Sequence, residues 1–263
     1  MVIQRPPRSA VPLYDRALLL SGSKRNRILE LWEVQTYGTD SFADPDYVCI
    51  YGLKPAEGYA CGIRILGRTA VECTRDCLAE QIGKDIAEVA RTAPAIAGSM
   101  VVDPFAGSGN TLYWILRNLP RSKGIGFELD DAVFALSSKN LSIAGAPIEF
   151  ANQDYVTGLK NVALSADQLL VVFVAPPWGD ALSESSGLDL CRTEPPVPEI
   201  IDRIGQTFAD NKILFAIQVY ELLDPQALAE VKTRFDWSAL RIYNLNAPGR
   251  NHGILLGTRG WTT

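Results

Sequence analysis

Short apolar runs alternate with helix-patterned segments along the last two thirds of the chain. In the helical segments apolar residues recur every three or four positions, whereas the runs between them are short and bounded by turn-forming residues. The runs predict strands at residues 99–103, 123–129, 148–154, 168–178, 212–219, 239–245 and 252–258. The intervening segments predict helices at residues 111–119, 130–145, 199–209 and 225–235.

This order of elements predicts an α/β fold with a seven-stranded, mostly parallel sheet. Strands that alternate with helices form parallel sheets that carry helices on both faces. The run at 168–178 is apolar almost throughout, which indicates burial on both faces. A short connection containing Pro, Gly and Asn separates 239–245 from 252–258, so we expect these two strands to pair antiparallel.

The first part of the chain lacks this regular alternation. After a Pro-rich start it predicts a helix at 25–34. Two strand-like pieces follow at 47–53 and 59–66, with a hairpin connection between them at 54–58. A further helix is expected at 75–90, with Thr74 as its N-cap. We therefore divide the chain into an N-terminal extension or substrate-side cap, residues 1–70, and a main domain, residues 71–263.

Charge is distributed unevenly along the chain. The net charge is −5, but residues 1–27 contain six basic residues and one acidic residue, so the rest of the chain carries −10. Proteins that grip long nucleic acids without sequence preference present a broad basic surface, which this acidic body does not offer. The basic start is expected to be a solvated tail.

Composition excludes several other classes. Five scattered cysteines do not form a disulfide framework, and a single histidine argues against a metal site. No stretch approaches the roughly 20 continuous apolar residues of a membrane helix, and the start lacks an apolar signal core. We expect a cytoplasmic globular protein without a bound metal.

The segment 101–111, "VVDPFAGSGNT", is the strongest chemical signal. Gly107 and Gly109 permit a sharp strand-to-helix turn whose backbone passes close to a ligand. A nicotinamide dinucleotide site would also use a glycine-rich turn, but residue 112 is leucine and the G-x-G-x-x-G spacing is incomplete. Asp103 would repel a pyrophosphate, so the segment favours a cationic ligand such as S-adenosylmethionine.

Two more acidic residues follow the next two predicted strands. Glu128 ends the strand at 123–129 and can accept hydrogen bonds from both ribose hydroxyls of an adenosine. Asp154 follows the third strand, where it can accept from an adenine amino group. Three acidic residues at the ends of three successive strands favour a methyltransferase over a nicotinamide enzyme.

After the fourth strand comes "APPWGD", residues 175–180. In this order, the motifs resemble the Rossmann-like methyltransferases that act on amino groups, in which (D/N/S)-P-P-(Y/F/W) holds the target amine. Over residues 70–258, "ECTRDCLAEQIG", "PPWGD" and "GLDLCRT" are similar to the trimethylguanosine synthase family, which methylates N2 of the RNA cap guanine. DNA methyltransferases with a similar glycine segment often carry the PP motif earlier in the chain.

The resemblance implies a set of site residues. It implies that Trp178 stacks on the substrate purine and that Thr74 lies near the methionine part of the cofactor. The cofactor-binding candidates are Thr74, Asp103, Pro104, Phe105, Ala106, Gly107, Gly109, Asn110, Thr111, Glu128, Leu129, Asp154, Tyr155 and Ala175. The catalytic candidates are Ala175, Pro176, Pro177 and Trp178, and the substrate-binding candidates are Trp178 and Asp180.

Ala175 departs from the family pattern, because the position normally carries a serine or an acidic residue that accepts a hydrogen bond from the amine. Alanine leaves only backbone carbonyls for that role. The sequence thus predicts methyl transfer to a planar, amine-bearing acceptor such as a cap guanine or a nucleotide. A small-molecule or protein methyltransferase and a non-catalytic binding module are the alternatives. His252 is interpreted as structural.

Overall fold

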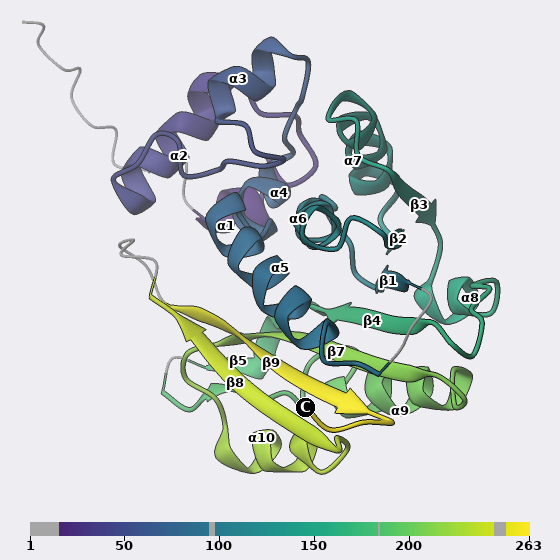
Figure 1. The fold of residues 1–263 in the computed structure, drawn as a ribbon. Helices are drawn as coiled ribbons and strands as arrows, with labels where there is room; N and C mark the ends of the chain where they lie inside the picture. The colour runs from purple at the N-terminus through teal and green to yellow at the C-terminus, as the bar shows by residue number, and fades with distance from the viewer. Residues whose placement is uncertain (1–15, 95–97, 184, 245–250) are drawn as a thin grey trace, which may run out of the picture.

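A single mixed sheet organises the structure, a computed structural model that describes residues 16–94, 98–183, 185–244 and 251–263. The strand order is β3-β2-β1-β4-β7-β9-β8 (Figure 1). All strands of this sheet run parallel except β9, which is antiparallel to β7 and β8. A separate antiparallel pair is formed by β5 (Leu182–Ser183) and β6 (Gly187–Leu188). Their bounds are β1 Ser99–Asp103, β2 Lys123–Glu128, β3 Ile148–Asn152, β4 Leu169–Val174, β7 Lys212–Tyr220, β8 Trp237–Tyr243 and β9 His252–Arg259. The fold class expected from the sequence, with its antiparallel last strand, is confirmed.

Helices cover both faces of the sheet because successive strand side chains point to opposite sides. In β4, Leu170 and Val172 pack into one core cluster, whereas Leu169 and Val171 pack into the other. The first cluster includes side chains of α8 (Tyr155–Leu159), α9 (Val197–Thr207) and α10 (Pro225–Lys232). The second includes side chains of α5 (Asp76–Ala90) and α6 (Asn110–Asn118). Strand β4 is buried along its whole length, as its continuous apolar run predicted.

The N-terminal segment packs against the glycine-loop side of the main sheet through a third core cluster. Leu29, Val34 and Ile63 of this segment share the cluster with Leu141 of α7. Each such fully buried aliphatic side chain stabilises the fold by roughly 1.5–3 kcal/mol. The helices involved are α1 Arg16–Leu20, α2 Leu31–Phe42, α3 Pro55–Ala60, α4 Gly67–Glu72 and α7 Asp131–Ile143. The segment is therefore attached by burial of apolar surface.

The prediction of strands at 47–53 and 59–66 in this segment is wrong. Among residues 16–70, which the structure describes, only two isolated bridges form, Ile50 with Leu53 and Ile28 with Leu66. The expected hairpin connection at 54–58 instead begins helix α3, with a proline at its first turn. The Glu57 carboxylate accepts the Lys54 backbone amide at 2.9 Å, which stabilises that helix start. Short β-branched runs with no partner strand thus yield to local helix capping.

Two helix boundaries also differ from the prediction. The helix expected at 25–34 begins only at Leu31, where the Glu33 carboxylate accepts the Glu30 amide at 2.8 Å. Thr74 does not cap α5, because Arg75 occupies the N-cap position without a side-chain cap. The Thr74 hydroxyl donates instead to Gln218 Oε1 at 2.9 Å, a partner 144 residues away.

The antiparallel direction of β9 places its first residue at the edge where the parallel strands end. His252 therefore pairs in register with Tyr220, the last residue of β7. The predicted Pro/Gly/Asn connection before it falls at 245–250, outside the described residues. Within the described ranges, no helix combines the length and apolar character needed to cross a bilayer.

Candidate active site

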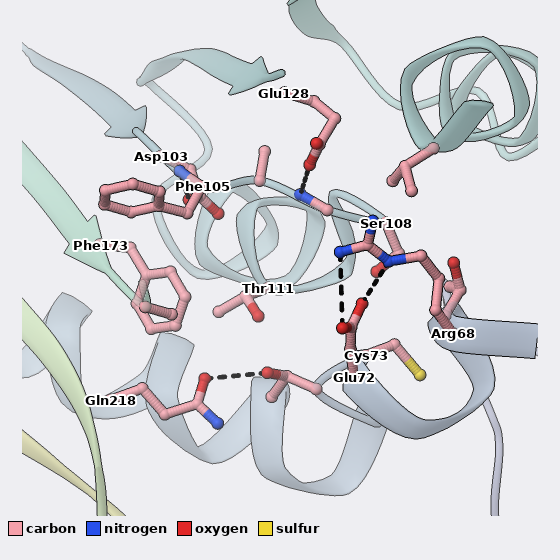
Figure 2. Close-up of a pocket in the computed structure, with 16 residues that line it drawn as sticks. Arg68, Glu72, Cys73, Asp103, Phe105, Ser108, Thr111, Glu128, Phe173 and Gln218 are labelled. Carbon is pink, nitrogen blue, oxygen red and sulfur yellow. Dashed lines mark hydrogen bonds and ion pairs between the residues drawn. The ribbon is translucent and has the colours of Figure 1, made fainter. Parts of the chain in front are cut away.

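The carboxyl ends of β1, β2, β4 and β7 open into two adjoining hollows. The smaller, here called the inner pocket, has a volume of about 100 Å³ and lies beside the glycine loop (Figure 2). The larger, the outer cleft, has a volume of about 1310 Å³ and contains the PPW motif. Pockets for one small ligand typically measure ~300–1,000 Å³, so together they offer room for a cofactor and an acceptor. Ligands of open α/β sheets bind at this edge of the strands.

The two predicted glycines have different roles in the loop between β1 and α6. Gly107 has φ +53°, and a Cβ built on it would meet only the Phe105 carbonyl oxygen at 4.0 Å. Gly107 lines both the inner pocket and the outer cleft, so its missing side chain leaves room for a ligand. Gly109 has φ +73°, and a Cβ there would meet Leu141 at 3.0 Å. Gly109 therefore serves helix packing.

Asp103 presents a buried carboxyl group to the inner pocket. The residue is 1% exposed, and the Phe105 amide donates to its Oδ1 at 3.0 Å. Burial raises the pKa of Asp103 to about 7, opposed by the Phe105 hydrogen bond and reinforced by the nearby Glu128. A bound cation would favour the ionised carboxylate, which is the behaviour expected of a sulfonium or ammonium site.

Glu128, at the end of β2, lines both hollows. Its carboxylate accepts the Asp130 amide at 2.8 Å and the Gly107 amide at 3.0 Å, and the latter contact is visible in Figure 2. Burial raises the pKa of Glu128, while the two backbone hydrogen bonds lower it. Carboxylate oxygens have about four acceptor sites, so capacity remains for hydroxyl donors of a ligand.

The third predicted acid lies in the outer cleft. Asp154 is the N-cap of α8, and its Oδ1 accepts the Val156 amide at 2.9 Å. Leu129 also lines the outer cleft and is 70% exposed. The cleft thus contains both an exposed apolar side chain and a carboxylate that can accept a hydrogen bond. Tyr155, mostly buried, also contributes to the lining.

The PPW motif forms the wall of the outer cleft that follows β4. Ala175 lines both hollows, and Pro176, Pro177 and Trp178 line the cleft. The indole of Trp178 stacks on the imidazole of His252, with ring centroids 5.5 Å apart and planes inclined by 20°. Two prolines fix the backbone before the indole, so the aromatic wall is rigid on the chain side.

Not every predicted site residue reaches the hollows. Thr74, Pro104, Phe105, Ala106 and Thr111 belong to their linings, whereas Gly109, Asn110 and Asp180 do not. Asn110 is buried beneath the loop. Its Oδ1 accepts the Tyr51 amide and its Nδ2 donates to the Thr74 carbonyl, both at 2.7 Å.

Asp180 is exposed, in the short helix η1 (Gly179–Ala181). Gly109, Asn110 and Asp180 remain predictions without a contact to the hollows.

Sequence reasoning missed three polar residues that line the hollows, Arg68 and Glu72 of α4 and Gln218 of β7. The Arg68 guanidinium donates to Glu72 at 2.7 Å (Figure 2) and to Asp130 at 2.8 Å. Both Arg68 and Glu72 line the two hollows. Gln218 also lines both hollows. The signal for Gln218 was its place as a lone polar residue inside the apolar run of β7. The i,i+4 spacing of Arg68 and Glu72 was visible, but nothing local indicated their position.

In the part of the chain that the structure describes, no cluster of three or more His, Cys, Asp or Glu side chains is placed to hold a metal ion.

The chain resembles methyltransferases in a comparison with curated proteins and in one with solved structures, whereas no family model matches it. A curated relative, the trimethylguanosine synthase of Schizosaccharomyces pombe, is 29% identical over 87 residues, which is 32% of this chain and 35% of that protein. The chain thus aligns with about a third of that relative's length. A putative O-methyltransferase from Klebsiella pneumoniae has 14% identity and a TM-score of 0.49, covering 77% of this chain and 86% of that one. A precorrin-6y C5,15-methyltransferase from Geobacter metallireducens has 11% identity and a TM-score of 0.45, covering 73% and 91%. The curated relative confirms, over these 87 residues, the resemblance inferred from the motifs.

Proposed function

We propose that this protein is an S-adenosylmethionine-dependent methyltransferase that acts on a planar acceptor. The observation that carries the proposal is the convergence of Asp103, Glu128 and Asp154 with Trp178 on one continuous pair of hollows. The acids come from the ends of three strands and the indole from the end of a fourth. This arrangement pairs a site for a cationic adenosine-containing donor with a stacking wall for an acceptor.

The residues fit this cofactor chemically. Asp103 and the open side of Gly107 accommodate the charged methionine part, Glu128 accepts from ribose hydroxyls, and Asp154 with Leu129 receives the adenine ring. When bound, S-adenosylmethionine supplies a methyl group on a positively charged sulfur. The protein's own contribution to such a transfer is to hold donor and acceptor in line and to exclude water.

The acceptor is proposed to stack on Trp178, with its reactive atom directed toward Ala175. Ala175 offers a backbone carbonyl rather than a side-chain acceptor, so positioning replaces hydrogen bonding by a side chain at this point. An exocyclic amine of guanine, as in an RNA cap or a nucleotide, fits a flat aromatic wall. The curated relative's family supports this more specific choice.

A small-molecule or protein acceptor is the second candidate, and the charges of the outer cleft favour it. Six acidic and four basic residues line the cleft, and the body of the chain is acidic. The acidic residues are Glu72, Glu128, Asp130, Asp154, Glu194 and Glu199, and the basic ones are Arg16, Arg25, Arg68 and Arg203. A neutral or cationic acceptor would meet less repulsion there than a polyanion.

We further propose that residues 1–70 act as a substrate-side cap on the domain 71–263. Arg16, Leu20, Arg25 and Arg68 reach the outer cleft from this segment. Appended segments commonly set acceptor choice on a shared catalytic fold.

Calorimetry with S-adenosylmethionine and S-adenosylhomocysteine tests the cofactor site. Asp103→Asn and Glu128→Gln are expected to weaken binding of S-adenosylmethionine at least tenfold. Asp180→Asn, an exposed carboxylate outside both hollows, is the matched control and is expected to bind normally. Unchanged affinity in both pocket variants would refute the proposed site.

Transfer of a labelled methyl group tests the acceptor. Label is expected on 7-methylguanosine cap analogue or capped RNA, and the transfer is expected to disappear in Trp178→Ala. Labelling of a metabolite or protein pool instead would favour the second candidate. Cofactor binding without transfer to any of these would indicate a non-catalytic binding module.

A further inference from the structure

His252 forms one side of the aromatic wall to which we assigned the acceptor. Its ring stacks on Trp178 at 5.5 Å and meets Tyr220 edge-on, at 6.3 Å and 77°. Tyr220 in turn lies 6.5 Å from Trp178. Trp178 and His252 both line the outer cleft. We call these three side chains the ring cluster.

The ring cluster follows from the sheet register rather than from sequence proximity. Tyr220 ends the parallel strand β7, and His252 begins the antiparallel strand β9 directly opposite it. Trp178 arrives from the end of β4, the neighbour of β7 on its other side. One face of the indole is thereby occupied by the imidazole. A planar ligand in the cleft would then stack on the other face.

The imidazole is held in its neutral form by its surroundings. Nδ1 is buried and has no hydrogen-bond partner among the described residues. Orphaned buried N–H groups are rarer than orphaned acceptors, so the proton belongs on Nε2. Burial lowers the pKa of His252 below 6.5, and the charges of Arg75 and Arg16 lower it further. Glu221 acts in the opposite direction, but its carboxylate already accepts the Asn251 amide at 2.7 Å.

We propose that neutral His252 is a positioning residue for the acceptor site, holding the indole of Trp178 in the orientation that receives a planar ligand. This inference rests on the proposed function, since it takes Trp178 as the acceptor wall. Burial and two nearby arginines disfavour a proton on the imidazole, and this cost outweighs the attraction between a cation and the indole face, so protonation loosens the ring cluster. Acceptor affinity therefore falls as the pH drops below 6.5, independently of the cofactor site.

The chain's single histidine makes a direct test possible, because NMR shows one imidazole signal for the full chain. The protein is saturated with S-adenosylhomocysteine, so that titration of Asp103 does not vary cofactor occupancy. The indole N–H signal of Trp178 is assigned by its loss in Trp178→Phe. The imidazole signal and this indole signal are expected to shift with one shared midpoint below pH 6.5. In His252→Phe the shift of the indole signal is expected to disappear.

A binding arm uses 7-methylguanosine cap analogue as the probe, again with the cofactor site saturated. His252→Ala is expected to weaken its affinity about three- to tenfold at pH 7.5, the range of one aromatic pair. His252→Phe, which keeps a ring but cannot be protonated, is expected to stay near the wild-type affinity and to lose the decline below pH 6.5. Unchanged affinity for S-adenosylhomocysteine in both variants shows that they are folded.

The two arms separate the inference from the proposed function. An indole signal that does not follow the histidine midpoint, or wild-type probe affinity in His252→Ala, would overturn the role of His252. If the wild-type protein binds no cap analogue, the proposed acceptor is wrong, and the NMR titration alone decides about His252.

Discussion

At the scale of single residues, the buried carboxyl group of Asp103 lowers the stability of the ligand-free protein above pH 7 but suits binding of a cationic ligand. Its carboxyl group is almost fully buried, and burial is what raises its pKa from 3.8 to about 7. The folded chain then binds a proton more tightly than the unfolded chain between these two values. The tighter binding of this proton by the folded chain stabilises the fold. That stabilisation is fully present below pH 3.8 and is lost as the pH rises through about 7. The ligand-free protein thus carries an unfavourable buried charge above pH 7.

Asp103→Asn is expected to stabilise the ligand-free protein at pH 8, because it removes that charge while keeping an acceptor for the Phe105 amide. The gain should be about 1–3 kcal/mol, on the order of a buried polar group's desolvation. Denaturant unfolding at pH 8 and pH 5 measures it, and the gain should shrink at pH 5, where Asp103 of the wild type is protonated. A variant less stable than wild type at pH 8 would contradict the assignment, and Asp180→Asn controls for surface charge.

Binding of S-adenosylmethionine is expected to release a proton from Asp103. With a pKa of about 7 the carboxyl group is about half protonated at pH 7, and a bound cation favours its ionised form. Calorimetry at pH 7 in two buffers with different ionisation enthalpies should report about half a proton released, and close to none at pH 9. Equal observed enthalpies in the two buffers at pH 7 would rule out the linkage.

At the scale of elements, the turn between β1 and α6 separates ligand contact from packing. Gly107→Ala places a methyl group at the open side of the hollows, so cofactor affinity is expected to fall with a stability loss of only about 1 kcal/mol from its positive φ. Gly109→Ala presses a methyl group against Leu141 at a positive φ, so its main effect is expected to be a stability loss of ~1–3 kcal/mol. Paired calorimetry and urea unfolding check this, and the reverse ranking would contradict it.

At the scale of the whole molecule, the N-terminal segment is bound both by apolar burial and by polar contacts under the site. Asn110 joins Tyr51 of that segment to Thr74. Removal of residues 1–70 would expose Leu141 and leave the Asn110 oxygen without the Tyr51 donor.

A chain limited to residues 71–263 is therefore expected to be several kcal/mol less stable than the full chain and to lose acceptor binding. Thermal unfolding with and without S-adenosylhomocysteine measures the first effect, and cap-analogue binding the second. A truncated chain as stable as the full one would show that the segment is only loosely associated. Asn110→Ala in the full chain, expected to cost about 1–3 kcal/mol, isolates the polar part.

The sequence by itself determined the sheet and the convergence of three acidic residues at its edge. Continuous apolar runs such as Leu169–Val174 can only be buried, and alternation with helices makes the sheet parallel. Acids placed directly after such runs must then meet at one edge, as Asp103, Glu128 and Asp154 do. These conclusions depend on contacts near in sequence and on a regular period.

Only the tertiary structure decided the remainder. The N-terminal pieces became turns and the helix α3, because no strand was available to pair with them and local capping prevailed. Arg68 and Gln218 entered the site through contacts distant in sequence. His252 met Trp178 because an antiparallel strand begins where parallel strands end, and that register is fixed by the burial of β7 and β9 together. Such long-range packing leaves no local pattern in the chain, which is why the sequence predicted methyl transfer but not the full aromatic wall that we propose for the acceptor.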